Sequence, residues 1–226
     1  ETAGTLVLFN WQDYIGSKTL AGFEKSTGIH VTEVTFSVEE EMLGEVQTNL
    51  SAYDVVVASD DTVREMIEAK LLAPIDTSKL KHFSNIGPKY RNPPCDPQQQ
   101  YTVPYLIGST GMLINKKYIK DNVDSWQVLW DARYADKIAM LDDPFDVIAV
   151  ACKLLGHSIN TEKPDELLQA RQLLLRQKPL LRGYLEVTTI QTLMLREELW
   201  AAHIYSGEGL AAAAENKQLA YITPRE

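Results

Sequence analysis

Segments with strand character and segments with helix character alternate along the first hundred residues of the chain. The strand signals lie at 6–9, 31–36 and 53–58, and the helical signals lie near 18–26, 39–48 and 62–70. The valine run at 55–57 in the third strand signal predicts a fully buried segment. Because consecutive strands separated by helices form right-handed crossovers, this spacing predicts a parallel sheet of the α/β class. The alternation begins again after Gly108, with strand signals at 111–114, 137–141, 201–205 and 219–222 and helical signals at 126–129, 147–155, 164–177, 189–197 and 207–217. We therefore predict two α/β lobes, 1–108 and 109–226, with 101–108 as the extended segment that joins them.

The first strand is apolar on both faces over residues 6–9, which is typical of a central strand in a parallel sheet. In open α/β folds, ligands bind just beyond the carboxyl ends of such strands, and Trp11, Asp13 and Tyr14 follow at that place. An aromatic face beside a carboxylate suits a cation. The alternative is that Trp11 belongs to the core and Asp13 caps the next helix.

Acidic residues also end the third strand signal, where Ser59, Asp60 and Asp61 precede a helix. A serine or aspartate at such a place caps the helix, whatever else it does. Acidic residues thus follow strand ends at Asp13, at Asp60 and Asp61, and at Asp142 and Asp143, on the side where an α/β sheet binds ligands. We hypothesise that they converge on one cleft.

A second acidic group follows the strand signal at 137–141 and opens a helix. Asp143 and Asp146 are three residues apart, so they project from the same side of the first helical turn. Capping and the helix dipole are the alternative explanation for acids at this place. With Asp142 they also spell the magnesium-binding motif of prenyl-transferring enzymes, but those enzymes are all-helical and this chain contains strands.

Composition and motifs exclude several classes of function. The net charge of −9 disfavours a nucleic-acid binder and is compatible with a cationic partner. No apolar run approaches the roughly 20 residues that span a bilayer. No nucleophile elbow, P-loop or dinucleotide motif is present, and the two cysteines have no metal spacing. Nucleophilic catalysis therefore has little support in the sequence.

Several longer signatures occur in order along the chain. They are FNWQDYI at 9–15, FEKSTGI at 23–29, AYDVVVAS at 52–59, YTVPY at 101–105 with GSTG at 108–111, SWQVLW at 125–130 and LDD at 141–143. Through them the chain resembles the bacterial spermidine/putrescine-binding proteins, the extracytoplasmic receptors of polyamine ABC importers. This resemblance covers essentially the whole chain.

The resemblance implies a two-lobed, periplasmic-binding-protein-like α/β fold of type II that closes over a ligand cleft. The residues expected to bind the ligand are Trp11, Asp13, Tyr14, Ser59 and Asp61 in the first lobe and Asp143, Asp146 and Tyr205 in the second. Relatives often carry glutamate in place of Asp146, tryptophan in place of Tyr205 and a bulky residue in place of Asp61. Such receptors are longer at their C-terminal end, so we expect a chain that is truncated relative to the family.

By this resemblance we expect the chain to bind putrescine or spermidine for uptake by an ABC transporter permease. We also expect that it is not an enzyme and that it holds no cofactor and no metal. It implies a periplasmic location, or one on the extracellular face of the membrane, for a processed product whose export signal is out of view. We expect a monomer that binds no nucleic acid. The alternatives are a ligand-sensing domain of a larger receptor, a receptor for another cationic solute and, less favoured, a metal-dependent enzyme that uses Asp142, Asp143 and Asp146.

Overall fold

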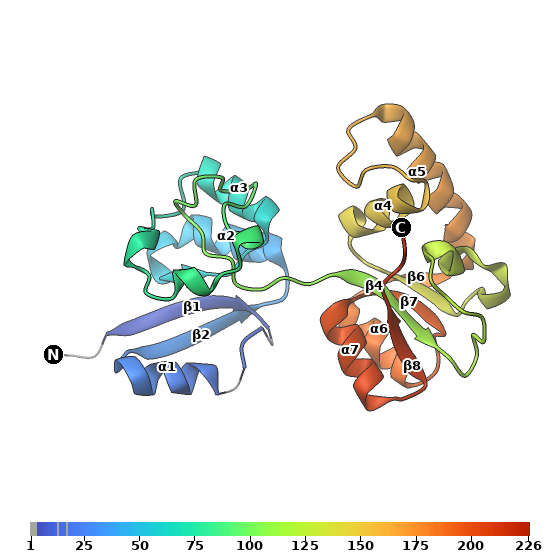
Figure 1. Cartoon of the computed structure of the whole chain (residues 1–226), viewed down its shortest axis with the longest axis horizontal. Coiled ribbons are helices and arrows are strands. Elements are labelled where there is room, and N and C mark those ends of the chain that lie inside the picture. Colours follow the sequence, from blue (N-terminus) through green and yellow to red (C-terminus); the bar gives the residue numbers. More distant parts are fainter. Residues whose placement is uncertain (1–3, 13, 17) are drawn as a thin grey trace. The chain divides into compact units, whose positions relative to one another are not determined.

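The computed structural model describes residues 4–12, 14–16 and 18–226. The chain divides into two compact units, Glu1–Ile107 and Gly108–Glu226, and each is described by itself (Figure 1).

Unit 1 contains a three-stranded parallel sheet in the order β2-β1-β3. Its strands are β1 (Thr5–Trp11), β2 (His30–Phe36) and β3 (Val55–Val56), and its α-helices are α1 (Thr19–Thr27), α2 (Glu39–Thr48) and α3 (Asp60–Glu68). Short 3-10 turns occupy Leu50–Ala52, Thr77–Lys79, Phe83–Asn85 and Pro88–Tyr90. The core lies between the sheet and α2 and α3, with α1 on the other face (Figure 1). The predicted alternation and the central place of β1 are confirmed.

The third strand differs from the prediction. Its valine run suggested complete burial, but β3 contains two residues, and the side chain of Val55 is 44% exposed. The reason is that β3 is an edge strand of this sheet, where one long side has no partner strand among the described residues.

A buried aspartate organises the loop that leads toward the end of unit 1. Asp96 is 4% exposed, and its carboxylate accepts hydrogen bonds from the N–H groups of Gln100, Tyr101 and Thr102 at 2.8–3.0 Å and from the Thr102 hydroxyl at 3.0 Å. Burial by itself would raise the pKa of Asp96, but these hydrogen bonds favour the ionised form and hold the pKa below its usual value.

Unit 2 contains a five-stranded mixed sheet in the order β6-β5-β7-β4-β8. Its strands are β4 (Thr110–Asn115), β5 (Ile138–Leu141), β6 (Leu181–Leu185), β7 (Ala201–Tyr205) and β8 (Leu219–Ile222). Its α-helices are α4 (Pro144–Leu154), α5 (Pro164–Gln177), α6 (Val187–Leu195) and α7 (Ser206–Glu215). Helices α4 and α5 cover one face of the sheet, and α6 and α7 cover the other (Figure 1).

Two elements of unit 2 depart from the sequence-based prediction. Strand β6 was not expected, because Arg182 and Gly183 interrupt its apolar pattern. The register shift between Ile138 and Ala139 shows that Arg182 forms a bulge, and its guanidinium lies 3.3 Å from the carboxylate of Asp136. The helix expected near 126–129 is a 3-10 turn, Trp126–Trp130, followed by another at Ala132–Tyr134.

Candidate functional site

The acidic site of unit 2 lies at one edge of its sheet. Strands β5 and β7 are parallel, so their carboxyl ends lie at the same edge. Strand β4 is antiparallel to β7 and pairs Thr110 with Tyr205, so it begins where β7 ends. The sheet therefore gathers Thr110, Tyr205 and the first turn of α4 at one place.

Asp143 has two roles at this edge. As the N-cap of α4, its Oδ1 atom accepts hydrogen bonds from the N–H groups of Phe145 at 2.9 Å and Asp146 at 3.1 Å. Its other oxygen, Oδ2, accepts a hydrogen bond from the Tyr205 hydroxyl at 3.3 Å. The capping alternative is thus correct, and it leaves the second oxygen directed to the tyrosine.

Asp146 stands beside Asp143 in the same turn and is partly buried. Burial raises the pKa of the Asp146 carboxyl, and the negative charge of Asp143 raises it further. Hydrogen bonds with the side chains of Tyr205 and Thr110 act in the opposite direction but are weaker. A nearby cation would therefore favour the ionised form of Asp146.

A buried histidine lies close to this acid pair without neutralising it. His203 is fully buried on β7, where its Nδ1 atom accepts a hydrogen bond from the N–H of Leu141 at 3.4 Å. Its ring packs edge-to-face against Trp126, with the ring centroids 5.4 Å apart. Burial lowers the pKa of His203 to about 4, although the charge of Asp143 opposes this shift. The imidazole is therefore neutral at neutral pH.

In unit 1 the structure brings two of the predicted aromatic residues together. Trp11 ends β1, and its ring centroid lies 4.6 Å from that of Phe36 and 6.0 Å from that of Tyr14. Trp11 is half-buried against the core, while Tyr14 is 41% exposed and its carbonyl oxygen accepts a hydrogen bond from the Tyr105 hydroxyl at 2.6 Å. Asp13 lies outside the described residues.

Ser59 and Asp61 mark the start of α3. The Ser59 hydroxyl oxygen caps the helix by accepting a hydrogen bond from the N–H of Thr62 at 3.4 Å, as its position predicted. The side chain of Asp61 is 84% exposed and lies 3.6 Å from Arg64 in an ion pair along the helix. Asp61 is therefore a surface carboxylate with a cationic neighbour, which distinguishes it from the partly buried acid pair of unit 2.

Sequence reasoning missed two residues near the acid pair. Thr110 interacts with Asp146 only because β4 and β7 pair in a particular register, and no local motif signals this. Phe145 follows Pro144 in the first turn of α4 and is 81% exposed. Its signal in the sequence was a large apolar residue between two acids.

The acidic residues are not arranged as a metal site. Within the described ranges, no group of three or more histidine, cysteine, aspartate or glutamate residues is placed to hold a metal ion. Asp142 is exposed, whereas Asp143 and Asp146 are turned to Tyr205 and Thr110. This geometry gives no support to the metal-dependent alternative.

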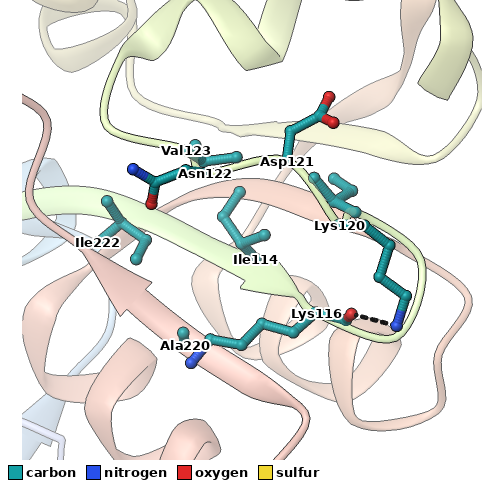
Figure 2. Close-up of a pocket in the computed structure, with 9 residues that line it drawn as sticks. Ile114, Lys116, Lys120, Asp121, Asn122, Val123, Ala220 and Ile222 are labelled. Atoms are coloured by element: carbon teal, nitrogen blue, oxygen red, sulfur yellow. Dashed lines mark hydrogen bonds between the residues drawn. The ribbon is translucent and has the colours of Figure 1, made fainter.

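Unit 2 also contains a recess of about 310 Å³, whose lining differs from that of the acidic site (Figure 2). It is lined by Ile114, Lys116, Ile119, Lys120, Asp121, Asn122, Val123, Ala220 and Ile222. Asp121 is 2.7 Å from the guanidinium of Arg133, and the two lysines would repel a cation. The recess also lies at the opposite end of β4 from Thr110, so it is not part of the acidic site.

Comparisons with known proteins agree with the fold. A family model for bacterial extracellular solute-binding proteins matches residues 18–226. The putrescine/cadaverine-binding protein of Pseudomonas aeruginosa is 32% identical over 94% of this chain, and the spermidine/putrescine-binding periplasmic protein of Salmonella typhimurium is 31% identical over 98%. The chain spans 62% and 64% of the lengths of these relatives, slightly under two thirds.

Solved structures show the same likeness. The spermidine/putrescine ABC transporter substrate-binding protein PotD from Streptococcus pneumoniae superposes with a TM-score of 0.89 at 28% identity, over 98% of this chain and 68% of the other. A putative spermidine/putrescine ABC transporter from Listeria monocytogenes gives a TM-score of 0.85 at 31% identity, over 98% and 69%. The predicted periplasmic-binding-protein fold is therefore confirmed, as is the resemblance to polyamine-binding proteins.

In the described part of the chain, no helix has both the length and the apolar character needed to cross a membrane. The matched family consists of solute-binding proteins and not of enzymes, which agrees with the prediction of a non-catalytic chain. On the match over 18–226, the chain belongs to the family of bacterial extracellular solute-binding proteins.

Proposed function

We propose that this chain binds polyamines such as putrescine and spermidine, and that it does so for uptake through an ABC transporter permease on the extracytoplasmic side of the membrane. The observation that carries the proposal is the acid pair of Asp143 and Asp146, which lies partly buried beside Tyr205 and Thr110. The names of the relatives, among them binders of putrescine with cadaverine and of putrescine with spermidine, support the same ligand class.

The ligand chemistry follows from the charges of unit 2. Two neighbouring carboxylates repel each other, and burial weakens their hydration, so an ammonium group placed between them relieves both costs. Because His203 is neutral, it offers no internal cation in place of the ligand. Two charge-assisted contacts at about 1.5–3 kcal/mol each, with burial of methylenes, approach the roughly 8 kcal/mol of a micromolar complex.

The predicted residues of unit 1 carry chemistry that suits the same class of ligand. Trp11 and Tyr14 would cover methylenes or face an ammonium group with their rings, and Asp13 would pair with an ammonium. The Ser59 hydroxyl oxygen keeps one acceptor position beyond its capping bond, and Asp61 would attract the cation at longer range. We further infer a monomer that binds no nucleic acid.

Calorimetric titration of the chain, extended to millimolar ligand, tests this function. Putrescine and spermidine should bind, and butylamine should bind more weakly because it carries one ammonium group. Magnesium chloride in a separate titration distinguishes the metal-dependent alternative. A magnesium signal without any heat from the amines would refute the proposal.

A further inference from the structure

The first turn of α4 presents a large aromatic side chain to solvent. Phe145 is 81% exposed, more than any other large hydrophobic side chain among the described residues. A single exposed apolar side chain is common on a protein surface, but Phe145 lies between Asp143 and Asp146 in the first turn of α4, so its ring belongs to the same turn as the acid pair.

Packing of the helix does not explain Phe145. Helix α4 contributes Val147, Val150, Ala151 and Cys152 to the core through its other side. The backbone N–H of Phe145 donates to Oδ1 of Asp143 at 2.9 Å, which holds the backbone of Phe145 next to the acid pair. Ile148, one turn further along, is also exposed and extends the apolar surface away from the acids.

An aliphatic diamine combines charged ammonium groups with apolar methylenes, and this surface offers carboxylates beside apolar side chains. Its ammonium group seeks the carboxylates, and its methylenes remain in water unless an apolar side chain lies beside them. Phe145 and Ile148 offer this apolar surface next to Asp143 and Asp146 within two turns of one helix.

We propose that Phe145 is a specificity-determining residue, whose ring covers the methylene chain of a diamine held by Asp143 and Asp146. This inference rests on the proposed function and deepens it. Because each additional methylene gains contact with the ring, the affinity of the chain should rise with the length of the diamine from 1,3-diaminopropane to cadaverine.

The test compares these two diamines on the wild-type chain and three variants. Phe145→Ala should bind cadaverine about tenfold more weakly but 1,3-diaminopropane within about threefold of wild type. Phe145→Leu should retain cadaverine binding within about threefold, because leucine is still apolar. The matched control is Leu175→Ala, which removes an exposed apolar side chain from α5 in the same unit and should leave both affinities unchanged. Thermal melting should show all variants folded, because both side chains are exposed.

The outcomes separate the two proposals. If the wild-type chain binds neither diamine and neither putrescine nor spermidine, the proposed function is refuted and this inference with it. If it binds putrescine or spermidine but not cadaverine, the function stands and this inference is refuted. If the wild-type chain binds both and Phe145→Ala binds both unchanged, the function stands and the role of Phe145 is refuted. An equal loss for both diamines, or a loss in Phe145→Leu as large as that in Phe145→Ala, would also overturn the idea that the ring covers methylenes.

Discussion

Replacement of Asp143 by asparagine separates the two roles of this side chain. Oδ1 caps α4 by accepting the N–H groups of Phe145 and Asp146, and asparagine caps a helix about as well as aspartate. The substitution therefore preserves the start of the helix and removes the negative charge beside Tyr205. Any loss of amine binding then reports on charge and not on local unfolding.

The structure gives the size of the expected effect. Loss of one hydrogen bond between charged groups costs about 1.5–3 kcal/mol, so putrescine should bind roughly ten- to a hundredfold more weakly to Asp143→Asn. The free energy of unfolding without ligand should change by less than about 0.5 kcal/mol, since the cap is retained. The pKa of Asp146 should fall, because the charge of Asp143 is one of the causes that raise it.

Calorimetry with putrescine, urea denaturation and NMR titration of the Asp146 carboxyl measure these three effects. Asp142→Asn is the matched control, because it removes an exposed acid from the same loop and should bind within about threefold of wild type. Asp143→Ala should lose both the affinity and about 1 kcal/mol of stability, since it removes the cap as well. Unchanged putrescine affinity in Asp143→Asn would reduce Asp143 to a helix cap.

Three further predictions concern other residues. Trp11→Phe should abolish the change in tryptophan fluorescence caused by putrescine; a change that persists would show that another tryptophan reports the ligand. Asp96→Asn should lower the free energy of unfolding by about 1.5–3 kcal/mol in urea at neutral pH, because it removes a buried charge that accepts several hydrogen bonds. In the wild type the stabilisation from Asp96 is present above the unfolded-state pKa and should disappear as the pH falls through the lowered folded-state pKa. Urea denaturation at several pH values should therefore show less loss of stability in acid for Asp96→Asn than for the wild type. An equal loss in both would contradict this role. The pKa of Asp146 is raised, so its contribution to stability is present below the unfolded-state pKa and is lost as the pH rises through the folded-state pKa. Putrescine binding needs the ionised carboxylate, so it should weaken as the pH falls through the folded-state pKa of Asp146. Calorimetry that shows no such weakening would refute the role of the Asp146 charge.

Local sequence predicted the parts of the fold and site that depend on neighbours along the chain. The apolar residues on both faces identified β1 as a central strand, and the spacing of Asp143 and Asp146 placed them on one side of a helical turn. These inferences need only the geometry of one strand or one turn, which a few consecutive residues determine.

The features that the sequence did not reveal depend on strand pairing. Thr110 meets Asp146 because antiparallel β4 and β7 pair in one register, and Arg182 bulges because β6 shifts its register against β5. Val55 is exposed because β3 lies at an edge of its sheet, although its own sequence is that of a buried strand. Register and strand order are set by contacts between distant segments, and periodicity within one segment does not contain them.

Helix capping and ligand binding were alternatives in the sequence, but in the structure the cap occupies only one of the two oxygens of Asp143. A carboxylate has two oxygens, and Asp143 uses Oδ1 for the cap and presents Oδ2 to Tyr205. Because the cap holds the carboxylate in one orientation, less conformational freedom remains to be lost when a cation arrives. Ser59 is more restricted, since its single oxygen accepts from the N–H of Thr62 and donates toward the Thr62 hydroxyl, leaving one acceptor position. If both residues bind the ligand, removal of Asp143 should therefore weaken an ammonium contact more than removal of Ser59.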